Sequence, residues 1–170
     1  MEPDPALLQP VIDGVADAED LESALNAIVG PLRSPLLLFH ASIASHPVGA
    51  AEVTVLAAWS MSDSAFEAGT QVSATISPIV TAVLDTLGQG QMASVSVGAD
   101  RDSLVDHLLR EQGVAALLSI PLHRDDQALL LLTLGSSVDG IFDQSKGGFF
   151  SDLAAGIRST VLRLATAPNT

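Results

Sequence analysis

Residues 111–136 read EQGVAALLSIPLHRDDQALLLLTLGS, and this stretch decides the fold that we predict for the chain. Gly113 stands where a preceding helix would end, because glycine adopts the left-handed backbone of a helix C-terminus with little strain. Two apolar runs follow, residues 114–122 and 128–134, with a polar turn at residues 123–126 between them. Continuous apolar runs of this length predict two strands that are covered on both faces.

The segments around this stretch alternate between helical and strand patterns. Apolar residues recur at the spacing of one helical face, which predicts helices over residues 17–32, 77–87, 100–112 and 149–165. Gly30 and Pro31 predict that the first of these helices ends there. Shorter apolar or alternating runs predict strands over residues 36–43, 52–60 and 93–97, whereas the polar residues 61–75 predict no element.

The predicted elements follow the order helix, two strands, helix, strand, helix, two strands, helix. Pairs of strands joined by short polar turns predict hairpins, and helices between them cross over the sheet. We therefore expect an α+β fold, an antiparallel β-sheet with helices on its faces. A length of 170 residues suits one domain.

The composition excludes several classes of function. With 20 acidic and 7 basic residues the formal net charge is −13, so we expect no contact with nucleic acid or with an anionic membrane surface. The absence of cysteine removes disulfides, thiolate metal sites and cysteine nucleophiles. The acidic, proline-containing start has no secretory pattern, and no apolar run reaches the ~20 residues that span a bilayer. We expect a cytoplasmic location, and the low lysine and high alanine and leucine content suggests a bacterium.

The pattern Gly-Val-x-Ala-x-Leu-x-Ile-Pro-Leu, polar turn, apolar strand, Gly-Ser resembles the centre of GAF domains, which are small-molecule sensing modules of signalling proteins. The resemblance covers residues 17–165, with residues 1–16 as a leader with a short helical turn and residues 166–170 as a tail or the start of a linker. It implies a sensory or regulatory domain of a bacterial sensor histidine kinase or transcription regulator. Catalysis would then lie in an output domain, and no catalytic motif occurs here.

The resemblance also implies where a ligand would bind. GAF domains hold their ligand between the sheet and the segment that leads from the second strand to the helix before Gly113, here residues 61–98. The sequence does not identify the ligand. For each expected lining residue, packing in the protein core is the competing interpretation. The expected lining residues are Trp59, Met61, Phe66, Met92, Leu104, His107 and Leu108.

Known ligands of such domains fit this sequence poorly. We do not expect a metal site, because no histidine pair has metal-binding spacing, and a haem would depend on one buried histidine, His107 or His40. We expect a bilin still less, since the attachment cysteine is absent and the chromophore-contacting histidine falls near Val105. The cyclic-nucleotide signature is matched at Phe142 but lacks its Asn-Lys and Asp-Glu pairs.

The terminal helices suggest a homodimer. In the last predicted helix, Phe150 and Leu162 lie beside the main apolar stripe and are candidates to face a partner. Leu21, Leu25 and Ile28 of the first helix would join them, with the N- and C-terminal helices packed together. The alternative is that these residues bury within one chain. A second function therefore stays open, a ligand-free dimerisation or protein-interaction module.

Overall fold

A computed structural model of the chain describes residues 5–47, 49–61, 67–73, 83–87, 89–97, 104–142 and 148–166, without the side chains of residues 104–106. Residues 83–87 are helical and lie between β3 and β4. No described helix is both long enough and apolar enough to span a membrane. The other elements are a 3-10 turn (Pro5–Leu7), α1 (Leu8–Ala16), α2 (Leu21–Leu36), β1 (Leu38–Pro47), β2 (Glu52–Ser60), β3 (Gln71–Ser73), β4 (Ala93–Ser96), α4 (Leu104–Glu111), β5 (Ala116–Arg124), β6 (Ala128–Ser136) and α5 (Gly148–Thr166).

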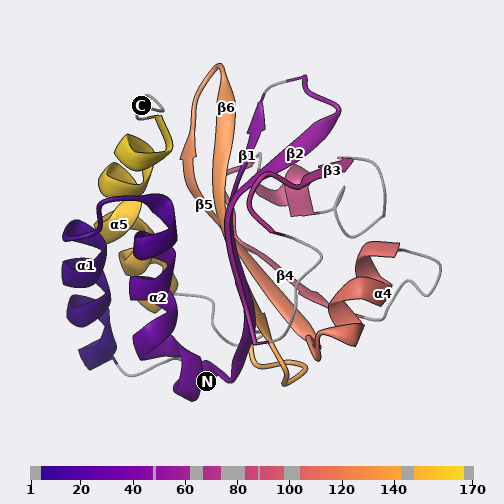
Figure 1. Cartoon of the computed structure of the whole chain (residues 1–170), viewed down its shortest axis with the longest axis horizontal. Helices are drawn as coiled ribbons and strands as arrows, with labels where there is room; N and C mark the ends of the chain where they lie inside the picture. Colours follow the sequence, from indigo (N-terminus) through magenta and orange to yellow (C-terminus); the bar gives the residue numbers. More distant parts are fainter. Residues whose placement is uncertain are drawn as a thin grey trace.

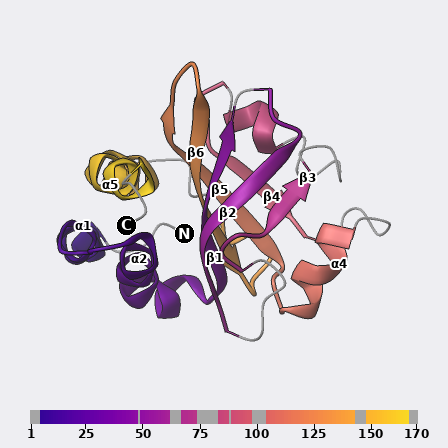
Figure 2. The ribbon, with the colours of Figure 1, turned by 45° about the horizontal axis from the view of Figure 1, so that its top comes forward.

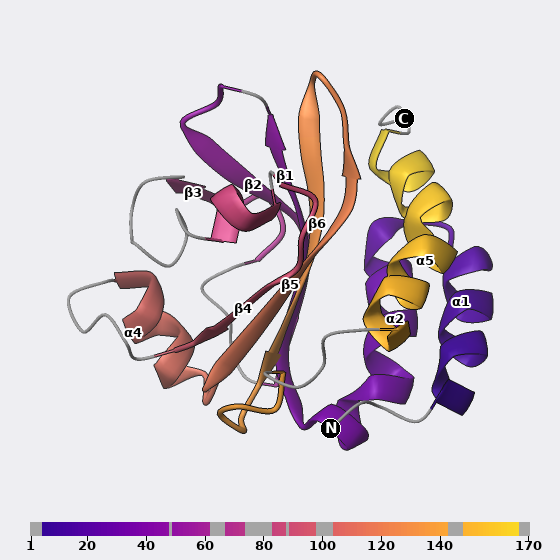
Figure 3. The same ribbon diagram turned by 180° about the vertical axis from the view of Figure 1, so that it is seen from behind.

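The strands form one six-stranded sheet in the order β3-β2-β1-β6-β5-β4, and every neighbouring pair is antiparallel. The helices α1, α2 and α5 lie on one side of the sheet, and α4 lies on the other (Figure 1). Figure 3 shows the same division from behind. We name the two sides the α2/α5 face and the α4 face. The predicted α+β architecture is confirmed.

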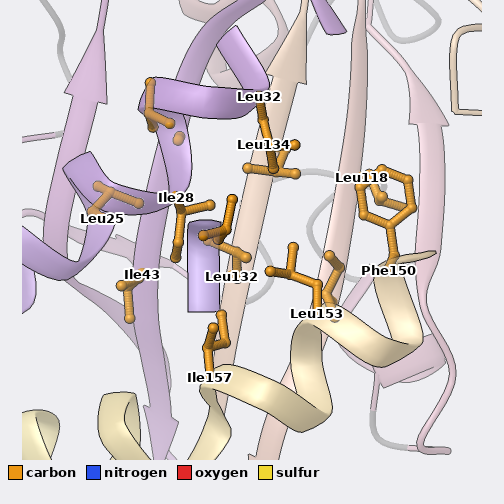
Figure 4. Close-up of a cluster of buried hydrophobic side chains, with 14 of the residues drawn as sticks. Leu25, Ile28, Leu32, Ile43, Leu118, Leu132, Leu134, Phe150, Leu153 and Ile157 are labelled. Atoms are coloured by element: carbon orange, nitrogen blue, oxygen red, sulfur yellow. The ribbon is translucent and has the colours of Figure 1, made fainter. Parts of the chain in front are cut away.

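Aliphatic side chains fill the α2/α5 face. Because side chains alternate along a strand, every second residue of β1, β5 and β6 points to this face. The helices contribute one apolar stripe each, and the two sets interdigitate with almost no exposure to solvent (Figure 4). The labelled members of this core are Leu25, Ile28, Leu32, Ile43, Leu118, Leu132, Leu134, Phe150, Leu153 and Ile157.

The helix α1 completes this layer by packing on both α2 and α5, so the N- and C-terminal helices lie together (Figure 2). Two glycines permit the close approach. A Cβ atom at Gly156 of α5 would lie 2.8 Å from Cγ1 of Ile12 and would also collide with its Cδ1. A Cβ atom at Gly14 of α1 would lie 3.0 Å from Cβ of Ala27 in α2.

The helix α2 differs from its prediction at both ends. It begins at Leu21, where the Asp20 carboxylate caps it by accepting a hydrogen bond from the Ser23 amide at 2.7 Å. It runs through Pro31 instead of ending there, although each interior proline removes a backbone hydrogen bond. The apolar spacing continues at Leu32 and Leu36, both at most 2% exposed, and their burial offsets that loss.

The strands also depart from prediction in two places. β1 covers Leu38–Pro47 instead of residues 36–43, because its pairing with β6 continues to the end of the hairpin. β3 was not predicted, because its three residues show no apolar alternation. It forms by pairing with β2, where Val53 lies opposite Val72, and β2 is separated from it in the sequence. The predicted helix 77–87 falls within the described residues only from residue 83, so its Ser77 and Pro78 start lies outside them.

Candidate ligand-binding face

Small and hydroxyl-bearing residues occupy the middle of the α4 face. The strand pairing places them in one row across β2, β1, β6, β5 and β4, which we call the hydroxyl row: Ala58, Ser42, Thr133, Ser119 and Ala93. Ser42 and Ser119 are only 8% and 2% exposed. The Ser119 and Thr133 hydroxyl oxygens are 2.8 Å apart, a hydrogen bond in which either can donate.

A second row lies beside the hydroxyl row, two residues along each strand, and centres on His40. His40 pairs with Ser60 on one side and with Gly135 on the other. A Cβ atom at Gly135 would lie 3.1 Å from Cβ of His40, so glycine leaves room for the imidazole. Ser60 donates a long hydrogen bond of 3.5 Å to Oε1 of Gln112, which is 7% exposed and follows α4.

The imidazole of His40 is neutral at neutral pH. His40 is 4% exposed, and this burial lowers the pKa of the imidazole from 6.5 to about 4, because the charged form loses its hydration. A neutral imidazole carries one donor and one acceptor nitrogen. His40 therefore contributes hydrogen-bonding capacity to this face without a fixed charge.

Apolar clusters border the hydroxyl row on both sides. One gathers Leu108 and Leu109 of α4 against Leu117 and Val95 of the sheet. The other gathers Val83 and Leu87 of the 83–87 helix against the sheet, with Ala44, Val53, Leu129 and Leu131. A few polar groups set between apolar walls is the usual composition of a small-molecule site.

Comparison with solved structures places this arrangement among known folds. The GAF domain of an Acinetobacter phosphoenolpyruvate-protein phosphotransferase is similar with a TM-score of 0.68 and 9% identity, over 97% of each chain. The GAF domain of a Bacillus halodurans two-component sensor histidine kinase is similar with a TM-score of 0.59 and 13% identity, over 93% of this chain and 95% of that one.

The chain has a GAF fold.

An enzyme with the same architecture is also similar. It is the Neisseria meningitidis free methionine-R-sulfoxide reductase, solved in complex with its substrate, with a TM-score of 0.67 and 16% identity over 97% of this chain and 95% of that one. No protein-family model and no curated sequence matches the chain. At these identities the likeness establishes the GAF fold alone.

Three of the predicted lining residues lie away from the hydroxyl row. Trp59 pairs with Ala41 on the α2/α5 face, where the Arg33 guanidinium lies 5.5 Å from its ring centroid. Met61 is 45% exposed, and its sulfur accepts a hydrogen bond from Nη2 of Arg33 at 2.9 Å. Met92 packs against the α2/α5 core. Because side chains alternate along a strand, Trp59 points to the α2/α5 face, and the prediction did not take this alternation into account.

Among the other predicted residues, Leu108 lies at the α4 face as expected. The His107 side chain is 56% exposed and its Nε2 lies 3.1 Å from the Glu111 carboxylate, so it points away from the sheet. Phe66 and the side chain of Leu104 lie outside the described residues.

The prediction missed the polar groups of the α4 face. Ser119 and Thr133 each interrupt a run of aliphatic residues, and that interruption was the signal available in the sequence. His40 was considered only as a haem ligand, and Ser42 and Gln112 were not considered. In the part of the chain that the structure describes, no cluster of three or more histidines and acidic residues could hold a metal ion.

The predicted dimer residues turn mostly inward. Leu25, Ile28 and Phe150 are at most 1% exposed and belong to the core of their own chain. The prediction that Phe150 faces a partner is therefore wrong, since its ring packs edge-on against Phe142 and Phe149 at centroid distances of 6.2 and 5.3 Å. The remaining two candidates, Leu21 and Leu162, are half-buried at the margin of the same core.

Proposed function

We propose that this chain is a sensory or regulatory GAF domain of a bacterial signal-transduction protein, which binds a small molecule on its α4 face. The hydroxyl row is the observation that carries the proposal. A core selected only for stability would place aliphatic residues in the middle of a covered sheet, as the α2/α5 face does. The α4 face places Ser42, Ser119 and Thr133 there instead.

The similar structures support the class of function. Two are domains of a phosphotransferase and of a sensor histidine kinase. A third is a GAF domain of a cyanobacterial phytochrome with bound phycocyanobilin. A covalently attached bilin is not proposed for this chain, because it contains no cysteine.

The described groups of the site favour an uncharged, hydrogen-bonding ligand. Hydroxyls and a neutral imidazole donate and accept hydrogen bonds, whereas a bound ion would need a compensating charge. Arg110 and Glu111, the charged residues that precede Gln112 at the end of α4, are exposed to solvent.

The sheet connects such a site to the terminal helices. In β1, the α4-face residues His40 and Ser42 alternate with Ala41 and Ile43, which are buried in the core under α2 and α5. A ligand that shifts β1 would therefore shift the surface on which α2 packs. We propose that binding favours one arrangement of the terminal helices and passes to an output domain in this way.

Native mass spectrometry of the domain purified from bacterial cells tests the proposal. We expect a small molecule retained by the wild-type chain and lost from the double variant Ser119→Val and Thr133→Val. The matched control is Ser159→Val, an exposed serine of α5, which should keep the molecule. A wild-type domain that carries no added mass, and that no member of a metabolite library stabilises against heat, would contradict the proposal.

A ligand-free homodimerisation module is the second candidate. The observation in its favour is the margin of the helical layer, where Leu21 and Leu162 remain half-buried. When a second copy of the chain covers apolar groups at such a margin, their burial lowers the free energy of the dimer relative to the separate chains. Sedimentation equilibrium of Leu162→Glu should then show a folded monomer, and a dimer that persists would contradict this interface.

A further inference from the structure

A hollow of about 620 Å³ lies on the α2/α5 side, between α5 and the β4 edge of the sheet. It is separate from the hydroxyl row, because its floor is Leu118, Ile120 and Leu122, which point to the opposite face of β5. Its volume falls within the usual range of small-molecule sites, roughly 300 to 1,000 Å³.

The sequence of α5 explains why the space exists. Leu153 and Ile157 fill the core beneath the helix and are fully buried. On the flank of the helix that borders the hollow, the residues are Ser151, Ala154 and Ala155, whose small side chains leave space between α5 and the Gln91–Ser94 edge, above a floor that is at most 2% exposed. Residues 151, 154–155 and 158 recur at helical spacing, so Arg158 continues this flank.

The polar groups around the hollow are those that would bind an anion. Arg158, Gln91, Ser94 and Ser151 line it, and none of the described residues that line it is acidic. This lining is unusual for a chain with 20 acidic and 7 basic residues. Among the described residues, no carboxylate forms an ion pair with Arg158. A guanidinium binds a carboxylate through two parallel hydrogen bonds.

We propose that this hollow binds a small aliphatic carboxylate, with its chain against Met92, Ala154 and Ala155 and its carboxylate on Arg158. The shape and the chemistry agree, since the lining is mostly apolar and Arg158 of α5 is the one cation among the described residues that line it. Such a ligand would bridge the sheet edge to the C-terminal helix. The site is independent of the ligand proposed for the α4 face.

Isothermal titration calorimetry with sodium octanoate tests this site, with octanamide as the uncharged probe of equal length. We expect octanoate to bind and Arg158→Gln to weaken it by about 10- to 100-fold, the loss typical of a hydrogen-bonded charge. Octanamide should bind the wild-type chain more weakly by a similar factor and should not respond to Arg158→Gln. The matched control, Arg163→Gln in the last turn of the same helix, should leave octanoate binding unchanged.

A second variant tests the cavity without touching the charge. Ala155 is exposed, so Ala155→Leu should fold normally by circular dichroism while filling the hollow and abolishing octanoate binding. Ser119→Val with Thr133→Val should leave octanoate binding intact, which separates this site from the α4 face. The proposal is overturned if octanoate does not bind at millimolar concentration, or if its binding ignores both Arg158→Gln and Ala155→Leu. It is also overturned if sedimentation shows a dimer that these two variants dissociate, because the hollow would then be an interface between copies.

Discussion

The two faces of the sheet are built from the same strands but from different side chains. Leu132 and Thr133 are neighbours in β6, yet Leu132 is fully buried under α2 and α5 while Thr133 bonds Ser119 on the α4 face. The α2/α5 face gains its stability from close-packed aliphatic contacts. The α4 face keeps hydroxyls and an imidazole where more aliphatic residues would stabilise the fold, which is the pattern expected of a face that binds something.

The sharpest test of this comparison substitutes the two neighbours. Leu132→Ala should lower the free energy of unfolding by about 2–5 kcal/mol, because it leaves a cavity that the surrounding helices cannot close. Thr133→Val made together with Ser119→Ala should change it by no more than about 1 kcal/mol, because both partners of the hydroxyl pair are removed and neither hydroxyl is left buried without a partner. Urea denaturation of both variants measures the difference. Equal losses of unfolding free energy would show that the two faces contribute alike to the stability of the fold.

The pH dependence of stability tests the buried imidazole. The pKa of His40 is lowered from 6.5 to about 4 in the folded chain, so between these values the unfolded chain binds a proton that the folded chain does not. His40 therefore leaves stability unaffected above pH 6.5 and reduces it progressively as the pH falls to 4, by about 3 kcal/mol in total.

The measurement is the difference in unfolding free energy between wild type and His40→Gln across that pH range. Wild type should lose more stability on acidification than the variant. His107→Gln is the control, because this histidine is exposed on α4. If the wild-type and His40→Gln curves stay parallel, the imidazole is not buried as described.

A smaller effect tests how closely the α2/α5 layer is packed. Gly156→Ala should lower the free energy of unfolding by about 1–3 kcal/mol, because the added methyl meets Ile12 of α1. Gly30→Ala should instead raise it by up to about 1 kcal/mol, since nothing lies within 4 Å of the added atom and alanine favours the helix. Thermal unfolding of the two variants shows whether each substitution raises or lowers stability relative to wild type. A stabilising Gly156→Ala would show that α1 packs loosely on α5.

Most of the fold was predictable because its signals are local. Apolar runs separated by polar turns predict β5 and β6, and helical periodicity predicts α5. The continuation of α2 through Pro31 was not predictable from propensity, because the helix is stabilised there by burial of Leu32 and Leu36 against elements distant in sequence. β3 was missed for the same reason, since three residues become a strand only through their partner.

The candidate site was predicted less well than the fold. Trp59 and Met92 were expected in the pocket because large apolar residues often line ligands, but both pack against the helical layer, Trp59 because side chains alternate along β2. Phe150 was expected at an interface and lies in the core, because α5 buries a wider face than its main stripe.

The sequence by itself determined the α+β class, the hairpin of β5 and β6, the absence of cysteine chemistry and the acidic surface. These properties depend on composition and on the short-range periodicity of apolar residues. Only the tertiary structure decided that Ser42, Ser119 and Thr133 lie in one row beside His40, and that Arg158 faces an aliphatic hollow. The reason is that strand register and helix orientation are set by contacts between residues far apart in the chain, and a site is made where those contacts bring polar groups together.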